Sequence, residues 1–322
     1  MIKILKKVSL KQPVFIACWP GMGEVAMRAG VFLKEALKMS LFARIENTGF
    51  FQPQGVVVSR GIVSIPLIEE GAFYYYKPSG REKDIVLFIA EAQPPMDKVF
   101  QMSKLIVNFA VSLKVSRIFT FAAFPRAIEH TQDSGVWVSA TDKQVLAEFS
   151  KYRVKVLSDG QISGLNGLIL GTAKGQKIKG ACLLGEIPLY TIQIENPKAS
   201  LSLLKLLAHY LKIDINFKPL EERKDFLSKE IDKLVSFLKG ELPPPQEMLP
   251  LSEDDIRAMK RELEKLGKLP ESVRLKIEDL FKRSLRDVSA ASELKKVLDE
   301  WNVYKDYEDR FLNLFKKKHT DH

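Results

Sequence analysis

The sequence is poor in the residues that build disulfide frameworks and zinc sites. It contains two cysteines, Cys18 and Cys182, and four histidines in 322 residues. Each cysteine lies in an apolar stretch that is typical of a buried, reduced thiol. No Cys/His pairs stand at the spacing of zinc ligands. We therefore expect neither a disulfide-stapled domain nor a structural zinc site, and we assign no metal ligand.

Long apolar runs are also missing. No stretch approaches the roughly 18–20 apolar residues that span a bilayer. The apolar piece Val14–Trp19 near the start is too short for the hydrophobic region of a signal peptide. These absences predict a cytoplasmic protein with no membrane partner.

The chain further lacks the usual motifs of nucleotide loops and nucleophilic catalysis. The segment Trp19–Val25 has neither the G-x-G-x-x-G spacing of a dinucleotide loop nor the Gly-Lys-Ser/Thr of a Walker A loop. No G-x-S-x-G elbow occurs, and His130 has no evident Ser or Cys partner. We assign no catalytic residue and no cofactor on this basis.

The charge is unevenly distributed along the chain. The whole sequence has 50 Lys+Arg and 40 Asp+Glu, a formal net charge of +10. Residues 219–322 hold 22 basic and 23 acidic residues, which leaves 28 and 17, a net charge of +11, for residues 1–218. No basic run is interleaved with stacking aromatics, so nucleic acid is not an expected partner. The excess charge raises the question of which face of the N-terminal part is basic.

Apolar runs and amphipathic stretches alternate over residues 1–218. Buried strands are predicted at Val14–Cys18, Ile85–Ala90, Arg117–Ala123 and Ala181–Leu184. Helices are predicted at Glu24–Lys38, Val99–Leu113, Gly164–Thr172 and Ala199–Leu211. The segments Gly55–Ser64 and Ala72–Tyr76 are rich in β-branched or aromatic residues and are predicted as antiparallel additions to the sheet. This alternation predicts an α/β domain with a largely parallel sheet between helices.

The rest of the chain is helical and rich in charge. Phe226–Lys239 carries one apolar helical face, and it follows an α/β domain of about 215 residues. Three consecutive prolines within residues 241–251 predict an extended linker. Residues 252–322 are predicted as an all-α extension, whose apolar stripes pack on one another, on the α/β domain or on a partner.

The loop after the first buried strand is one candidate ligand site. Gly21 and Gly23 allow a close approach to the backbone, and the following helix N-terminus favours an anion. Glu24 at the start of that helix interacts favourably with the helix dipole but repels a phosphate. A tight strand-to-helix turn with no ligand is the alternative.

Polar residues near other strand ends complete the candidate ligand-binding set. Glu91 and Gln93 follow the strand Ile85–Ala90, and ligands bind outside the carboxyl ends of strands in open parallel sheets. Asn166 stands at a predicted helix start, where capping is the alternative, and Glu186 is placed after a strand. Glu91 and Glu186 suit acid/base work only where their separation and burial split their pKa values.

Four segments together resemble the PAC2 family, named for proteasome assembly chaperone 2 and also described in prokaryotes as an ATP-grasp-like group. They are PVFIACWPGMGEVAMRAGVFLKEAL, DIVLFIAEAQPP, SGLNGLILGTA and LLGEIPLYTIQIENPKASLSLLKLLAHYLKIDI, in that order, and the resemblance covers roughly residues 10–240. Because the resemblance includes the helix after Leu220, it implies the bounds 1–240 for the α/β domain. It also implies a three-layer α/β/α fold similar to nucleoside phosphorylases and a tendency to form homo-oligomers. It also implies a chaperone role in proteasome assembly without an established catalytic mechanism.

One departure from the family concerns the C-terminus. Archaeal members that bind the proteasome resemble its activators in ending with a hydrophobic-Tyr-any tail. This sequence ends with residues 319–322, HTDH, so docking into a proteasome pocket through that tail is not expected.

Two functions follow as hypotheses. The first is a non-enzymatic, homo-oligomeric assembly chaperone or scaffold with protein partners, proteasome-related by resemblance. The second is a small-ligand-binding protein or enzyme with a phosphorylase-like site for a nucleoside or an anionic ligand.

Overall fold

A computed structural model describes residues 1–46, 49–50, 56–65, 71–80, 83–243, 251–266, 271–287, 289–301 and 303–316. Most of the predicted proline-rich linker (residues 244–250) and the tail at residues 319–322 lie outside the described residues. The chain divides into two compact units, Met1–Met259 and Lys260–His322. Each unit is described by itself.

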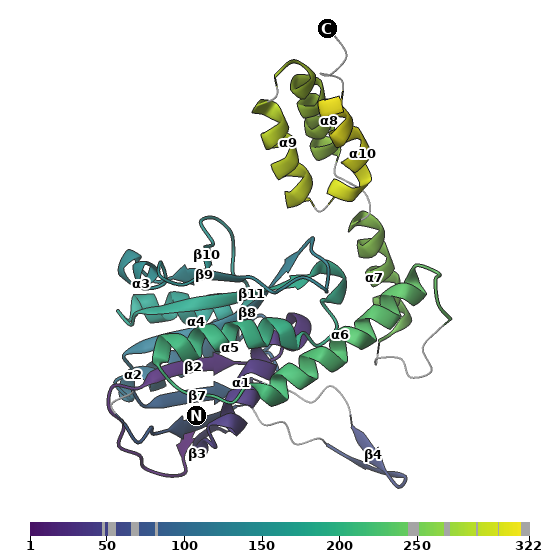
Figure 1. The fold of residues 1–322 in the computed structure, drawn as a ribbon. Coiled ribbons are helices and arrows are strands. Elements are labelled where there is room, and N and C mark those ends of the chain that lie inside the picture. The colour runs from purple at the N-terminus through teal and green to yellow at the C-terminus, as the bar shows by residue number, and fades with distance from the viewer. Residues whose placement is uncertain are drawn as a thin grey trace. The chain divides into compact units, whose positions relative to one another are not determined.

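A mixed sheet forms the centre of the first unit (Figure 1). In the described residues its strand order is β1-β3-β6-β7-β2-β8-β11-β9-β10. The four central strands are parallel: β7 (Ile85–Ile89), β2 (Val14–Cys18), β8 (Arg117–Arg126) and β11 (Gly180–Pro188). All residues of β7, β2 and β11 and half of those of β8 are buried, because helices cover both faces of the sheet. The predicted largely parallel α/β core is confirmed.

Shorter strands extend the sheet on both sides. On one side lie β6 (Ala72–Tyr76), β3 (Ser40–Ile45) and β1 (Ile2–Ile4), each antiparallel to its inner neighbour. On the other side β9 (Val136–Ala140) runs antiparallel to β11, and β10 (Lys155–Val156) runs parallel to β9. The predicted antiparallel addition at Ala72–Tyr76 is therefore confirmed.

Helices form the two outer layers. The helices α1 (Val25–Ala36) and α5 (Pro197–Leu211) share one apolar cluster with one face of the sheet, while α2 (Val99–Ser112) and α4 (Gly164–Gly175) share a second cluster with the other face. The remaining helical segments of this unit are η1 (Met22–Glu24), α3 (Lys143–Glu148), η2 (Leu189–Thr191), α6 (Lys218–Leu238) and the first half of α7 (Glu253–Leu266). The result is a three-layer α/β/α fold.

One strand prediction needs correction. Within the predicted sheet strand Gly55–Ser64, the described residues form the hairpin of β4 (Val57–Ser59) and β5 (Ile62–Ser64), which is a separate two-stranded sheet. The turn at Arg60 and Gly61, both with positive φ, reverses the chain. The two halves of the apolar run therefore pair with each other, and neither is part of the central sheet.

The second unit is a small helical bundle. It contains α8 (Glu271–Arg286), α9 (Ser289–Glu300) and α10 (Tyr304–Lys316). Its core holds Ile277, Leu280, Phe281, Leu294, Val297, Leu298 and Phe311. The apolar stripes of these helices therefore pack on one another. None of the described helices in either unit has the length and apolar character needed to cross a membrane.

Candidate functional site

A cleft of about 580 Å³ opens at the carboxyl edge of the parallel strands. We call it the carboxyl-edge cleft. Its described lining includes Trp19, Gly21, Gln93, Phe124, Asn166 and Leu184. This volume falls within the range of small-molecule sites.

Chain topology explains why the cleft opens here. The neighbouring parallel strands β2 and β7 are followed by helices on opposite faces of the sheet, α1 and α2. Where adjacent strands lead to opposite faces, a crevice remains outside their carboxyl ends, and open α/β sheets bind their ligands there.

Gln93 connects two segments that border the cleft. Its Nε2 donates a hydrogen bond of 2.8 Å to the carbonyl oxygen of Pro20. A Cβ atom added at Gly164 would lie 3.4 Å from Oε1 of Gln93, and Gly164 has φ +69°. The structure therefore brings the predicted residues Gly21 and Gln93 together, and Gly164 stands where the positive φ would strain a residue with a side chain.

Asn166 supplies an uncommitted acceptor. It is the third residue of α4, whose N-cap is Ser163, so it does not cap the helix. Its Oδ1 is buried and has no hydrogen-bond partner among the described residues. The Ser163 side chain makes no capping bond either, which leaves N–H groups of the first turn of α4 without a side-chain acceptor. The Asn166 acceptor and N–H donors of α4 therefore occur together where the N-terminus of α4 borders the cleft.

Gly23 and Glu24 belong to a packed turn. Gly23, at φ +61°, donates from its N–H to the carbonyl oxygen of Ile192 at 2.7 Å and accepts from the N–H of Asn196 at 2.8 Å. Burial raises the pKa of Glu24, and the nearby Arg28 guanidinium partly counteracts that rise. Among the described residues that line the cleft, neither Gly23 nor Glu24 occurs.

Glu186 does not follow a strand as predicted, because β11 continues to Pro188. Its carboxylate accepts from Trp137 Nε1 at 2.7 Å, Lys155 Nζ at 3.2 Å and the Gly135 N–H at 3.1 Å. Burial by itself would raise its pKa, but these bonds hold the pKa of Glu186 below its ordinary value. The side chain therefore fastens β9 and β10 to β11.

Glu91 is exposed just beyond β7. Of the described residues that line the carboxyl-edge cleft, the one with a carboxylate is Asp159, while Glu91 and Glu186 are not part of the lining. Nor do any three described His, Cys, Asp or Glu side chains group as metal ligands. The cleft therefore presents amide, backbone and apolar groups rather than the paired carboxylates that acid/base catalysis would use.

A cluster around His130 was not predicted. Its Nδ1 lies 2.7 Å from the Tyr190 hydroxyl, and its Nε2 lies 2.7 Å from Oδ1 of Asp232. The Tyr190 hydroxyl also accepts from the His130 N–H at 2.7 Å. These residues are distant in sequence, so no local pattern indicated their contact.

The three layers, the mixed sheet with a parallel centre and the cleft at its carboxyl edge define an α/β protein of the PAC2 type. The sequence model of the PAC2 family matches residues 15–235. This chain belongs to the PAC2 family.

Relatives in archaea cover most of the chain. An uncharacterized protein of Methanocaldococcus jannaschii, MJ1210, is 27% identical over 263 residues, which are 80% of this chain and 98% of that protein. Pyrococcus furiosus PbaB, described as an archaeal proteasome activator, superposes with a TM-score of 0.63 at 22% identity over 73% of this chain and 98% of its own. Pyrococcus furiosus PbaA, an archaeal homolog of proteasome-assembly chaperone, gives a TM-score of 0.58 at 21% identity over 82% and 98%. At these identities the solved structures show a shared fold.

Proposed function

We propose that this chain is a non-enzymatic assembly chaperone or scaffold that works as a homo-oligomer and holds a proteasome-related protein partner. Family membership supports the proposal, as does the likeness to PbaA and PbaB. The observation that carries it is the exposed apolar hairpin β4–β5.

This hairpin presents six aliphatic side chains to solvent. Their exposed fractions run from 51% at Val57 to 73% at Ile62, and the set is Val56, Val57, Val58, Ile62, Val63 and Ile65. A two-stranded hairpin is marginally stable by itself, and its free edges are templates for further pairing. Such a group of exposed aliphatics marks an interaction site.

A second copy of the chain is the occupant we propose for the hairpin. Arg60, in the turn, is the one charged residue within residues 56–65. Two copies therefore meet along the strands with little like-charge repulsion. Antiparallel edge pairing about a two-fold axis is also self-complementary, as a symmetric dimer requires.

Light scattering coupled to size exclusion tests this role. The variant Val58→Thr/Val63→Thr keeps β-branched residues at a cross-strand pair but removes apolar surface. We expect the mass to fall toward the protomer value of 36.5 kDa. Val156→Thr, at a 46% exposed position on β10, is the matched control and should keep the wild-type mass. A monomeric wild type, or an unchanged mass in the double variant, would contradict the proposal.

The helical bundle is the proposed partner-binding element. Leu285, Trp301, Leu312 and Phe315 are exposed on it, at 66%, 38%, 43% and 46%. In a pull-down with proteasome subunits, Leu285→Ser/Leu312→Ser should lose capture, whereas Val111→Ser on α2 should retain it. Equal capture by both variants would rule out the bundle as the binding element.

A second candidate function is binding of a small ligand in the carboxyl-edge cleft. The unpartnered Oδ1 of Asn166 favours it, because a ligand N–H or O–H would satisfy that buried acceptor. No Lys or Arg occurs in the described lining, which favours an uncharged nucleoside-like ligand over an anion. A thermal-shift panel of nucleosides tests this, since a ligand at 100 times its Kd adds about 2.7 kcal/mol of stability. No shift with any nucleoside would leave the cleft without this function.

A further inference from the structure

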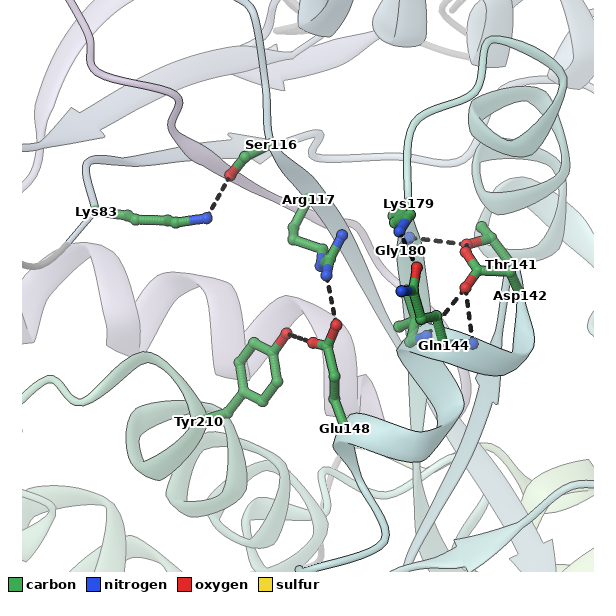
Figure 2. A network of polar contacts seen from close by, with 11 residues as sticks. Lys83, Ser116, Arg117, Thr141, Asp142, Gln144, Glu148, Lys179, Gly180 and Tyr210 are labelled. Atoms are coloured by element: carbon green, nitrogen blue, oxygen red, sulfur yellow. Dashed lines mark hydrogen bonds and ion pairs between the residues drawn. The ribbon is translucent and has the colours of Figure 1, made fainter.

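A second cleft, of about 630 Å³, lies at the opposite edge of the sheet, where the strands begin. We call it the amino-edge cleft. Four basic side chains line it, from Lys83, Arg117, Lys151 and Lys212, together with Tyr152, Tyr210 and the carboxylate of Glu148. Figure 2 shows part of this lining, with Arg117, Glu148 and Tyr210 joined and Lys83 bonded to Ser116.

Both oxygens of the Glu148 carboxylate accept a hydrogen bond. One of its oxygens accepts from the guanidinium of Arg117 at 2.5 Å, and the other accepts from the Tyr210 hydroxyl (Figure 2). Burial and the nearby Glu148 raise the pKa of Tyr210 to about 12, so the phenol stays protonated and keeps donating. Glu148 thus balances the charge of Arg117.

The three lysines come from separate parts of the fold. Lys83 precedes β7, Lys151 follows α3, and Lys212 follows α5 with φ +57°. Lys83 Nζ donates to Ser116 Oγ at 3.2 Å, and Lys151 Nζ lies 5.3 Å from the centre of the Tyr152 ring. Within the described parts of the chain, none of the three is ion-paired with a carboxylate.

The sum of these charges is positive. Three uncompensated lysines contribute about three positive charges, and the C-terminus of α5 offsets only about half a charge. A concave site lined by one sign of charge focuses its field and concentrates counter-ions. The volume lies within the range of small-molecule sites, and the cations surround a hollow rather than form a stripe along the surface.

We propose that the amino-edge cleft binds a small polyanion whose recognised chemistry is a di- or triphosphate chain. The three lysines supply its counter-charges. The guanidinium of Arg117 contributes N–H donors beyond the one that Glu148 accepts, because an arginine carries five. This site is separate from both the apolar hairpin and the carboxyl-edge cleft.

Isothermal titration calorimetry of the full chain with inorganic tripolyphosphate, at constant ionic strength, tests the proposal. We expect one site per chain and weaker binding of inorganic phosphate. Lys83→Gln and Lys151→Gln should each weaken binding about tenfold, the usual effect of one charged hydrogen bond. Lys174→Gln, an exposed lysine in the last turn of α4 that is not part of the described lining, should bind within twofold of wild type.

A parallel titration with ATP identifies the source of the phosphate chain. Tighter binding of ATP than of tripolyphosphate indicates a nucleotide, and equal binding indicates recognition of the phosphate chain itself. Absence of binding at millimolar tripolyphosphate would overturn the proposal. So would an equal loss in Lys174→Gln, which indicates general electrostatic attraction, or a loss in Asn166→Ala, which assigns the anion to the other cleft. Circular dichroism confirms that each variant is folded.

Discussion

The indole Nε1 of Trp137 donates a 2.7 Å hydrogen bond to Oε1 of Glu186, and this contact joins β9 to the last parallel strand of the sheet. Lys155 on β10 reaches the same oxygen, and its amino group also lies 5.3 Å from the centre of the Trp137 ring. One buried carboxylate thus organises the three strands at this edge. Glu186 therefore stabilises this edge of the sheet and does not line the carboxyl-edge cleft.

Glu186→Gln should lower the free energy of unfolding by about 2 kcal/mol, because a neutral amide loses the charged bonds from Lys155 and Trp137. Urea titration at neutral pH measures this loss. Glu91→Gln, at an exposed position, is the control and should change stability by less than about 0.5 kcal/mol.

The same pair of variants gives a pH dependence with a definite sign. The pKa of Glu186 is lower in the folded protein than its ordinary value of 4.5, so the stability it supplies is present above that pH. This stability is lost as the pH falls through the folded-state pKa. The difference between wild type and Glu186→Gln should therefore shrink below about pH 4.5. A difference that stays constant into acid would show that the carboxylate charge has no part in the contact.

His130→Ala should loosen α6. The imidazole bridges the Tyr190 hydroxyl and the Asp232 carboxylate, each at 2.7 Å, and Asp232 lies on α6. Hydrogen exchange should accelerate in Lys218–Leu238 and stay unchanged in the central strands. Lys233→Ala, which removes an exposed pair with Glu230, should leave both regions unchanged. Uniform acceleration in every element would indicate global destabilisation instead.

Two glycines in helices should respond to alanine in opposite ways. A Cβ atom at Gly30 on α1 would lie 2.7 Å from the Cβ of Cys18 on β2, so Gly30→Ala should cost about 1–3 kcal/mol. A Cβ atom at Gly171 on α4 meets nothing within 4 Å among the described residues, so Gly171→Ala should add up to about 1 kcal/mol through helix propensity. Thermal unfolding of the two variants measures both. Stabilisation by Gly30→Ala would contradict the close packing of α1 on the sheet.

Two asparagines provide a matched comparison of structure and ligand binding. Oδ1 of Asn196 caps α5 by accepting from the Ala199 N–H at 3.2 Å, and Asn196→Ala should cost about 1 kcal/mol. Oδ1 of Asn166 is buried without a described partner, so Asn166→Ala should leave stability unchanged or raise it. A loss of stability in Asn166→Ala comparable to that of Asn196→Ala would show that this amide has a structural role.

The strands and helices of the core could be predicted because the sequence patterns that indicate them extend over only a few neighbouring residues. Val14–Cys18 is apolar throughout, and a continuous apolar run of this length favours a strand that is covered on both faces. Val99–Ser112 has a helical apolar period that is independent of its partners. Gln93 was proposed from the rule that ligands bind at the carboxyl ends of parallel strands, and Gly21 from the glycine-containing turn before a helix N-terminus; both line the cleft.

The pairing of strands at the β11–β9–β10 edge of the sheet could be seen only in the tertiary structure. β11 extends past Glu186 because Phe124–Arg126 of β8 pair in parallel with Glu186–Pro188. β9 and β10 were not predicted, and Val136–Ala140 pairs antiparallel with Ala181–Gly185 of β11. Pairing between two segments about 45 residues apart produces no periodic pattern in the sequence of either segment. The hairpin shows the same limit, since its composition indicated β-structure but its two-residue reversal decided which strands paired.

By itself the sequence determined the α/β class, the buried strands, most helices and the concentration of positive charge in residues 1–218, because composition and periodicity act over a few residues. Only the tertiary structure decided where that charge collects. Lys83, Lys151 and Lys212 lie far apart along the chain, and they line one cleft because the start of β7 and the C-terminal ends of α3 and α5 lie at the same edge of the sheet. Side chains that meet through the fold, rather than through neighbouring positions in the chain, carry no shared signal in the sequence.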